Sequence, residues 1–312
     1  MFLVTGGAGF IGSHLATTLL AGGRDVRIVD NLCTGSLDKV PRGAEFVLGD
    51  LADRDVAASV VRGCEIVLHQ AAIPSVPRSI DDPQSSHDAN INATFNILMA
   101  ARDAGVRRVV YAASSAAYGN SAELPNVETM PVNPESPYAL QKVVGEEYCR
   151  LFTRLYGLGT VSLRYFNVFG PRQDPSSPYS GVLSLFIRAA LSGTAPTIYG
   201  DGEQTRDFTY VSDVVDGVLR AVDAPAAAGE VINVATGRRI SLNQAWATLA
   251  ATMGPLRDPV YGPPRKGDVR DSQADITKAT QILGYRPATT FAEGLRQTVK
   301  WTREHLDLND VD

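Results

Sequence analysis

The stretch Thr5-Gly6-Gly7-Ala8-Gly9-Phe10-Ile11-Gly12 decides the fold, because it joins a short apolar run at residues 2–4 to a segment with helical spacing at residues 12–21. Its glycines satisfy both GxxGxxG and GxGxxG. Such glycines allow a tight turn, let backbone N–H groups approach a pyrophosphate and let a helix pack closely on a sheet. The alternative interpretation is an ordinary flexible turn between a strand and a helix, since glycine-rich turns are common.

Further apolar runs follow at residues 26–29, 45–47, 66–69, 109–112 and 161–165. These runs do not alternate with polar residues, which is typical of strands buried on both faces of a parallel sheet. Segments with helical spacing, notably 90–104 and 137–156, would supply the crossovers that parallel strands need. The pattern predicts an α/β fold with a doubly wound parallel (Rossmann) sheet.

Prolines become frequent after Gly170, which indicates a smaller, loop-rich mixed α/β lobe. Residues 206–234 return to a helical pattern that ends in the apolar run 231–234. We therefore expect a cofactor domain of residues 1–170 plus about 206–235. A discontinuous substrate lobe would contain about 171–205 plus 236–312.

Composition excludes several classes of protein. The 312 residues include 29 Lys and Arg against 34 Asp and Glu, so the net charge is −5 and the basic excess typical of nucleic-acid binding is missing. No segment reaches the roughly 18 apolar residues that a membrane helix needs. The three cysteines are scattered, the four histidines share no metal-ligand spacing, and the first residues do not resemble a secretory leader. We expect a cytoplasmic protein without a metal, a membrane segment or a nucleic-acid partner.

Two acidic residues follow strand-like runs. Asp30 comes 18 residues after Gly12, where its carboxylate would accept hydrogen bonds from a ribose and repel a 2′-phosphate, which favours NAD over NADP. The neighbouring Arg24 and Arg27 would weaken that preference. Asp50 is placed to bond an adenine amino group, or it is simply the N-cap of a helix over residues 51–60.

Tyr138 and Lys142 form a YxxxK pattern inside the helical segment 137–156. The i, i+4 spacing places both side chains on one helix face. An ammonium beside a phenol favours the phenolate, which lowers the phenol pKa toward the range of a general base. Alone the pattern is weak, because a surface tyrosine with a nearby lysine is ordinary. Ser114 and Ser115 follow the run 109–112, at the sheet edge where doubly wound proteins bind ligands.

Together these motifs resemble the extended short-chain dehydrogenase/reductase family, in its NAD-dependent nucleotide-sugar epimerase and dehydratase group. The matching stretches also include Arg164-Tyr165-Phe166-Asn167-Val168-Phe169-Gly170-Pro171 and Arg206-Asp207-Phe208-Thr209-Tyr210-Val211-Ser212-Asp213. The resemblance runs from residue 3 to about residue 286. It implies NAD as cofactor, a UDP-sugar as substrate and a homodimer built from the helices at 90–104 and 137–156 as a four-helix interface.

The resemblance also implies roles for individual residues. Those implied for the cofactor are Gly6, Gly9, Phe10, Ile11 and Gly12 for the pyrophosphate, Asp30 and Asn31 for the ribose, Asp50 and Leu51 for the adenine, and Gln70, Ala71, Ala72, Asn90, Tyr138, Lys142 and Tyr165 for the inner part. Those implied for the substrate are Ser114, Ser115, Tyr138, Asn167, Tyr199, Arg206, Arg265, Asp268 and Ser272. Ser114, Tyr138 and Lys142 would be catalytic.

The segment Ser114-Ser115-Ala116-Ala117-Tyr118-Gly119 carries no carboxyl group. By resemblance, relatives that eliminate water or decarboxylate carry an acid there. The expected reaction is therefore a 4-epimerisation of UDP-glucose and UDP-galactose through a 4-keto intermediate, catalysed by an isomerase that retains NAD. Ser272 falls where relatives that accept N-acetylated sugars carry a small residue, so UDP-GlcNAc and UDP-GalNAc are also expected; the alternative is that Ser272 is only a polar residue at a strand end.

Three other functions remain open on this sequence. The first is a uronic-acid 4-epimerase, although no dedicated arginine for a sugar carboxylate stands out. The second is a net reductase of a keto-sugar nucleotide. The third, from a different class, is a nucleotide-sensing binding protein that has lost catalysis.

Overall fold

The computed structural model of the protein describes residues 1–173, 181–264 and 269–305. Its centre is a seven-stranded sheet in the order β11-β6-β5-β4-β1-β2-β3, and every pair of neighbouring strands is parallel. The strands are β1 (Phe2–Thr5), β2 (Val26–Asp30), β3 (Glu45–Leu48), β4 (Ile66–His69), β5 (Arg108–Ser114), β6 (Gly159–Tyr165) and β11 (Val231–Val234). The predicted Rossmann sheet is confirmed.

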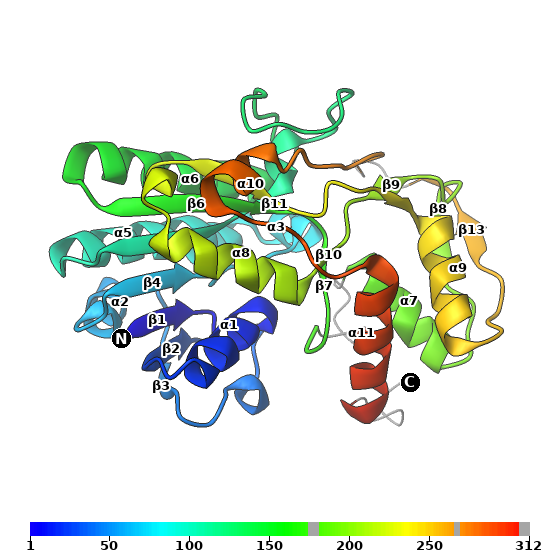
Figure 1. The fold of residues 1–312 in the computed structure, drawn as a ribbon, viewed down its shortest axis with the longest axis horizontal. Helices are drawn as coiled ribbons and strands as arrows, with labels where there is room; N and C mark the ends of the chain where they lie inside the picture. Colours follow the sequence, from blue (N-terminus) through cyan, green and yellow to red (C-terminus); the bar gives the residue numbers. More distant parts are fainter. Residues whose placement is uncertain (174–180, 265–268, 306–312) are drawn as a thin grey trace.

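Helices cover both faces of this sheet (Figure 1). Because successive strand residues point to opposite faces, Leu3 and Val4 of β1 belong to two different hydrophobic cores. One core is completed by α1 (Phe10–Ala21), α8 (Val211–Asp223) and α10 (Thr277–Leu283). The other contains α2 (Arg54–Val61), α5 (Ala93–Asp103) and α6 (Pro137–Tyr156).

Helix α6 matches its predicted bounds because both of its ends are encoded locally. Ser136 caps the N-terminus by accepting a hydrogen bond from the Ala139 N–H, and Pro137 occupies the first turn. Gly157 ends the helix in the left-handed region at φ 70°. Helix α5 begins later than predicted, at Ala93, because residues 88–92 form a π-helical turn, η2 (Asp88–Asn92).

Short elements lie between the larger ones. They are η1 (Leu37–Lys39), α3 (Val76–Asp81), α4 (Pro83–His87), η3 (Ser115–Tyr118), η4 (Pro225–Ala227), β7 (Val168–Phe169) and β10 (Thr209–Tyr210). The η3 turn follows β5 directly, so it sits at the carboxyl edge of the sheet. β7 pairs with β10 in a separate two-stranded sheet.

A smaller group of elements lies beside the sheet, on the right of Figure 1. It contains α7 (Val182–Leu191), α9 (Leu242–Met253), α11 (Phe291–His305) and the strand pairs β8 (Thr197–Tyr199) with β13 (Val260–Gly262) and β9 (Thr205–Arg206) with β12 (Ile240–Ser241). The three helices share a third core around Phe186, Trp246 and Leu295, to which β8 adds Ile198.

The C-terminal part of the chain is divided between the two groups. Ala279 and Leu283 of α10, with the following Tyr285, pack in the same core as β11 and α8. They therefore belong with the sheet, although they fall in the range predicted for the substrate lobe. None of the helices in the described part of the chain combines the length and the apolar character that a membrane crossing requires.

Candidate active site

The glycine-rich turn between β1 and α1 accepts glycine alone at key points. Gly6 has φ 65°, and a Cβ added there would lie 2.8 Å from the Ala71 backbone at the end of β4. A Cβ on Gly12 would lie 2.2 Å from the Gly6 carbonyl oxygen. Gly9 is the N-cap of α1, so this helix begins without a side chain over its first N–H groups, and Phe10 and Ile11 form its first turn. The turn is a cradle open to a phosphate group.

Asp30, at the end of β2, fixes the cradle from the side. One of its carboxylate oxygens accepts the Ala8 N–H at 3.0 Å, and the other accepts the Leu32 N–H at 2.8 Å. The side chain is 9% exposed. A carboxylate has about four acceptor positions, so capacity remains for two ribose hydroxyls.

Asp50 lies after β3, next to the end of β2. Its Oδ2 accepts a hydrogen bond from the Nδ2 of Asn31, the residue that follows Asp30, at 2.9 Å. The alternative interpretation of Asp50 as the N-cap of a helix over residues 51–60 is wrong. Helix α2 begins only at Arg54, and Asp53 caps it by accepting from the Asp55 and Val56 N–H groups. Leu51 is buried beneath this edge.

The loop after β4 is held by Thr5 from the neighbouring strand. The Thr5 Oγ1 accepts the N–H groups of Gln70 and Ala71, both at 3.1 Å, and bonds to the His69 Nδ1 at 2.8 Å. Tyr165, on β6, donates its hydroxyl to the Gln70 Oε1 at 3.2 Å. The Gln70 Nε2 is buried and has no hydrogen-bond partner among the described residues.

The tautomer of His69 follows from its partners. The Thr94 Oγ1 donates to the Asn90 carbonyl at 2.7 Å, so it must accept from the His69 Nε2–H. The Nδ1 is then the acceptor of the Thr5 hydroxyl proton. Burial, with a smaller effect from the Lys142 charge, lowers the pKa of His69 to about 3, so the ring is neutral at physiological pH.

Asn90, predicted to lie at the inner part of the cofactor, makes its hydrogen bonds within the protein. It is 1% exposed, and its Oδ1 accepts the Ile73 N–H at 2.8 Å. Its Nδ2 donates to the Ile73 carbonyl, the Ser86 Oγ and the Gln141 Oε1. Because both amide atoms are committed within the protein, Asn90 supports the loop that follows Ala72.

Ser114, Tyr138 and Lys142 come together at the carboxyl end of β5. The pKa of Tyr138 is raised by burial and lowered by a hydrogen bond with Ser114. Lys142 is 3% exposed; its Nζ donates to the Ala112 carbonyl at 2.8 Å and lies 6.0 Å from the centre of the Tyr138 ring. Burial lowers the pKa of Lys142 to about 8, against the raising effect of Glu146. The predicted lowering of the Tyr138 pKa by Lys142 is therefore wrong for the protein alone, since burial dominates.

Gly145 explains how α6 approaches β5 so closely. A Cβ there would lie 2.2 Å from the Tyr111 hydroxyl oxygen, so a larger residue would force the helix away from the strand. The close approach brings Lys142 within reach of the Ala112 carbonyl. Tyr138 is anchored from α3, because its N–H donates to the Ser79 Oγ at 3.1 Å.

The predicted substrate residues come from several elements. Ser115 begins η3, next to Ser114. Asn167 is exposed between β6 and β7, and its carbonyl accepts the Thr209 N–H at 3.1 Å. Tyr199 ends β8 and is 36% exposed. Arg265 and Asp268 lie outside the described residues.

Arg206 and Ser272 are brought together around Thr205. The Arg206 Nη1 donates to the carbonyls of Thr205 and Arg270, at 2.8 and 3.1 Å, and the Ser272 N–H donates to the Thr205 carbonyl at 3.2 Å. Ser272 is 8% exposed and lies in no strand, so the alternative of a polar residue at a strand end is wrong.

Several supporting residues were missed by sequence reasoning. Asp207 is fully buried and accepts hydrogen bonds from the N–H groups of Thr236, Gly237 and Ala274. It therefore joins three segments that are distant in sequence. Glu146 forms a buried ion pair with Arg164. A signal for Glu146 existed, because an acidic residue four positions after Lys142 falls on the same helix face. The partners of Asp207 are far away in sequence and leave no local pattern.

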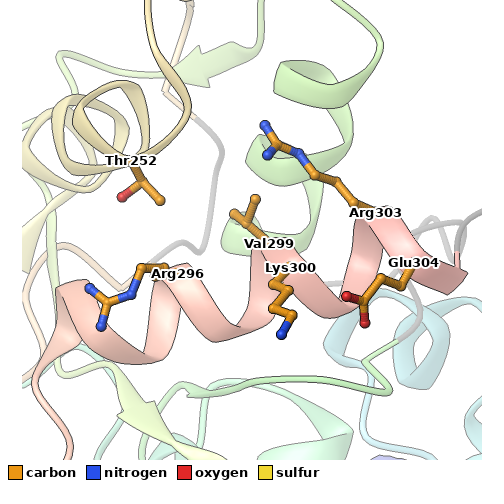
Figure 2. Close-up of a pocket in the computed structure, with 6 residues that line it drawn as sticks. All are labelled: Thr252, Arg296, Val299, Lys300, Arg303 and Glu304. Carbon is orange, nitrogen blue, oxygen red and sulfur yellow. The ribbon is translucent and has the colours of Figure 1, made fainter.

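The smaller group of elements also carries a groove, which is separate from the predicted cofactor, substrate and catalytic residues. It is lined by Thr252, Arg296, Val299, Lys300, Arg303 and Glu304. Figure 2 shows Thr252, which belongs to α9, across from α11, the helix that carries the other five. None of the six is a predicted site residue, and no group of three or more His, Cys, Asp or Glu side chains in the described ranges is arranged to hold a metal ion.

Three observations fit a bound dinucleotide: the cradle that a Cβ would fill, the acceptor capacity left on Asp30, and the buried Gln70 Nε2, which no residue in the described ranges hydrogen-bonds. With the reversal of strand order between β1 and β4, they define a dinucleotide-binding protein of the Rossmann type. The family model described as "NAD dependent epimerase/dehydratase family" matches residues 2–235. The chain belongs to this family, and NAD is its cofactor.

The matches to individual relatives cover almost the whole chain. A putative UDP-glucose 4-epimerase of Methanocaldococcus jannaschii is 41% identical over 307 residues, which cover 98% of this chain and 99% of the relative. The crystal structure of a UDP-glucose 4-epimerase of Thermotoga maritima with UDP-glucose matches at a TM-score of 0.95 and 39% identity, covering 98% and 99% of the two chains. A UDP-N-acetylglucosamine 4-epimerase of Methanobrevibacter ruminantium, in complex with UDP-N-acetylmuramic acid, matches at 0.94 and 37%, covering 98% of each chain.

Proposed function

We propose that the protein is an NAD-dependent 4-epimerase that interconverts UDP-glucose with UDP-galactose and UDP-GlcNAc with UDP-GalNAc through a 4-keto intermediate. The observation that carries the proposal is the placement of Ser114, Tyr138 and Lys142 together at the carboxyl end of β5, in a segment without a carboxyl group. This arrangement supplies a base for a hydroxyl proton and nothing that would remove a carbon-bound proton.

Ser114, Tyr138 and Lys142 each have a separate role in the proposed proton transfer. Ser114 holds the sugar O4 hydroxyl beside the Tyr138 phenolate, and Tyr138 removes the O4 proton and later returns it. The charged Lys142 ammonium lies beside the Tyr138 phenol and orients the nicotinamide ribose. Bound NAD would supply the hydride chemistry, by which the C4 hydride is removed and then returned to the other face of the rotated keto sugar. Burial raises the pKa of Tyr138 in the protein alone, and the positive charge of an oxidised nicotinamide beside the phenol would lower it.

Elimination chemistry is disfavoured by what surrounds the site. Burial raises the pKa of Tyr118, in the turn after Ser114, to about 12, so its hydroxyl stays neutral. Glu128 accepts the Asn233 N–H at 2.8 Å, and Glu146 is paired with Arg164. These carboxylates are committed to structural contacts and are not available as a dehydratase acid.

For the substrate we propose that Arg206, Asn167 and the undescribed Arg265 bind the diphosphate, with Tyr199 and Asp268 at the uridine. Planar guanidinium groups suit phosphate oxygens. The small side chain of Ser272 leaves volume for an acetamido group at C2. We propose a division into a cofactor domain and a substrate lobe, in which the lobe that carries most of these residues closes over the sugar nucleotide.

Product analysis tests this function. The protein is incubated separately with UDP-GlcNAc, UDP-glucose and UDP-glucuronic acid, and products are identified by NMR. We expect C4 epimers of the first two, no net change in NADH, and a loss of roughly 10²–10⁴-fold in rate for Tyr138→Phe. Epimerisation of the uronic acid alone favours a uronic-acid epimerase, steady consumption of NADH favours a reductase, and binding without turnover favours a sensor.

We also propose a cytoplasmic homodimer formed by α5 and α6. These helices leave large apolar side chains exposed on one surface, among them Phe95, Leu155 and Tyr156, with exposures of 37%, 61% and 52%. Phe95 packs on Tyr148 and Phe152, which joins the two helices at that surface. Light scattering at micromolar concentration should give the dimer mass, and Leu155→Glu should give the monomer. Leu37→Glu, at an exposed leucine on η1, is the control; a monomeric wild type contradicts the proposal.

A further inference from the structure

A buried ion pair lies one helical turn beyond Lys142. Glu146 on α6 binds Arg164 on β6 through two contacts, Nη2 to Oε2 at 2.7 Å and Nε to Oε1 at 2.9 Å. The two side chains are 2% and 4% exposed. The paired fork geometry fixes both groups in one orientation.

The pair also contacts the other half of the site. The Arg164 guanidinium carbon lies 4.6 Å from the centre of the Tyr118 ring, and Tyr118 belongs to the η3 turn that follows Ser114. The Tyr118 hydroxyl donates to the Asn233 Oδ1 of β11 at 2.7 Å. Arg164 therefore lies between the helix that carries Tyr138 and Lys142 and the turn that begins at Ser114.

Stability alone does not account for this arrangement. The Arg164 Nη1 is buried without a hydrogen-bond partner in the described part of the chain. A buried ion pair that leaves a donor unsatisfied is often no more stable than well-packed apolar residues of the same size. A gain in stability is therefore weak evidence of what the pair does.

The surroundings of Lys142 indicate the role of the pair. The titratable groups that face it are Tyr138, Glu146 and Cys149 on α6, Tyr111 on β5 and His69 on β4. His69 is neutral, burial raises the pKa of Cys149 to about 12, and burial keeps Tyr111 protonated. Among these groups Glu146 is thus the one that brings a negative charge to the buried ammonium.

We propose that Glu146, held in place by Arg164, is a positioning residue that keeps Lys142 charged and correctly placed for the cofactor. Glu146 touches neither substrate nor cofactor in this account and acts through Lys142. The proposal rests on the proposed function only for its kinetic consequences, because its effect on cofactor binding requires no turnover.

The test measures NAD affinity by calorimetry, and kcat/KM with UDP-GlcNAc, from pH 6 to pH 10. In Glu146→Gln the carboxylate is lost and the shape is kept, so the alkaline limb of both profiles should move to lower pH by about one unit, the lower end of what a neighbouring charge produces. Glu147→Gln is the matched control, since Glu147 is the next residue of α6, is about half exposed and pairs with Arg150 at the surface. It should leave both limbs in place.

Two further variants separate charge from folding. Glu146→Asp restores the charge and should bring the limbs back toward those of the wild type. Glu146→Met/Arg164→Met removes both charges and should regain thermal stability relative to Glu146→Gln while its limbs stay shifted. An unshifted limb in Glu146→Gln, or a double variant that regains the wild-type profile, overturns the proposal. If the wild type binds NAD but turns over no UDP-sugar, the proposed function fails and the affinity profile alone decides the role of Glu146.

Discussion

At the scale of the residue, the chemistry of the site depends on which buried side chains are protonated. Lys142 has a pKa of about 8 because it is buried, and His69 is neutral because it is buried between two hydroxyl groups. The sequence identified Tyr138 and Lys142 by their spacing. It could not show that burial outweighs the lysine in setting the Tyr138 pKa, because burial depends on the strands packed around the helix.

Ser272 is the residue on which substrate choice depends. Replacing it with tyrosine fills the volume proposed for an acetamido group, so Ser272→Tyr should lower kcat/KM for UDP-GlcNAc at least about tenfold more than for UDP-glucose. Ser272→Ala keeps the volume and serves as the control. Equal losses on both sugars would show that Ser272 does not contact C2.

His69, which hydrogen-bonds the Thr5 hydroxyl that holds the loop after β4, makes the stability of the folded protein depend on pH. Its pKa is about 3 in the folded protein against 6.5 when exposed, so the unfolded state binds the extra proton and stability falls as pH drops from about 6.5 toward 3. Between pH 6.5 and 5 this amounts to about 2 kcal/mol. Urea unfolding of His69→Gln should therefore show a smaller acid-induced loss than the wild type. His87→Gln, at an exposed histidine, should not, and equal pH dependence in all three proteins would contradict this role.

At the scale of the element, the sequence predicted most of the sheet and its principal helices. Short apolar runs buried on both faces, and the Ser136, Pro137 and Gly157 end signals of α6, are local features. The π-helical turn before α5 and the assignment of α10 to the sheet core were not predictable in this way. The turn is irregular backbone, and α10 joins the core through contacts with β11 and α8 that are distant in sequence.

The approach of α6 to β5 gives a prediction for Gly145. A glycine-to-alanine change in an exposed helix stabilises a protein by roughly 1 kcal/mol. Gly145→Ala should instead destabilise it by about 1–3 kcal/mol, because the new Cβ overlaps the Tyr111 ring. Gly217→Ala in α8 is the control, since its Cβ would meet a Val234 methyl at 3.1 Å and should cost less. Chemical denaturation measures both, and a stabilised Gly145→Ala would refute the packing argument.

At the scale of the whole molecule, the substrate half of the site could be predicted only in part. Most of the cofactor residues lie where consecutive strands of the sheet end or in the YxxxK pattern of α6, so local motifs locate them. Arg206 and Ser272 are brought together through Thr205 from segments 66 positions apart, and Asp207 joins these segments to the end of β11. The net charge of −5 excluded nucleic acid as a partner but did not bear on a diphosphate, which local arginines and backbone N–H groups would bind.

The central claim is that a hydride leaves C4 and returns to the same molecule without exchange with water. It is tested most directly by epimerising UDP-GlcNAc in D2O and examining C4 of the product by NMR. The account predicts UDP-GalNAc with protium at C4 and no accumulation of NADH. Deuterium at C4, or no epimer from either UDP-GlcNAc or UDP-glucose, would contradict it.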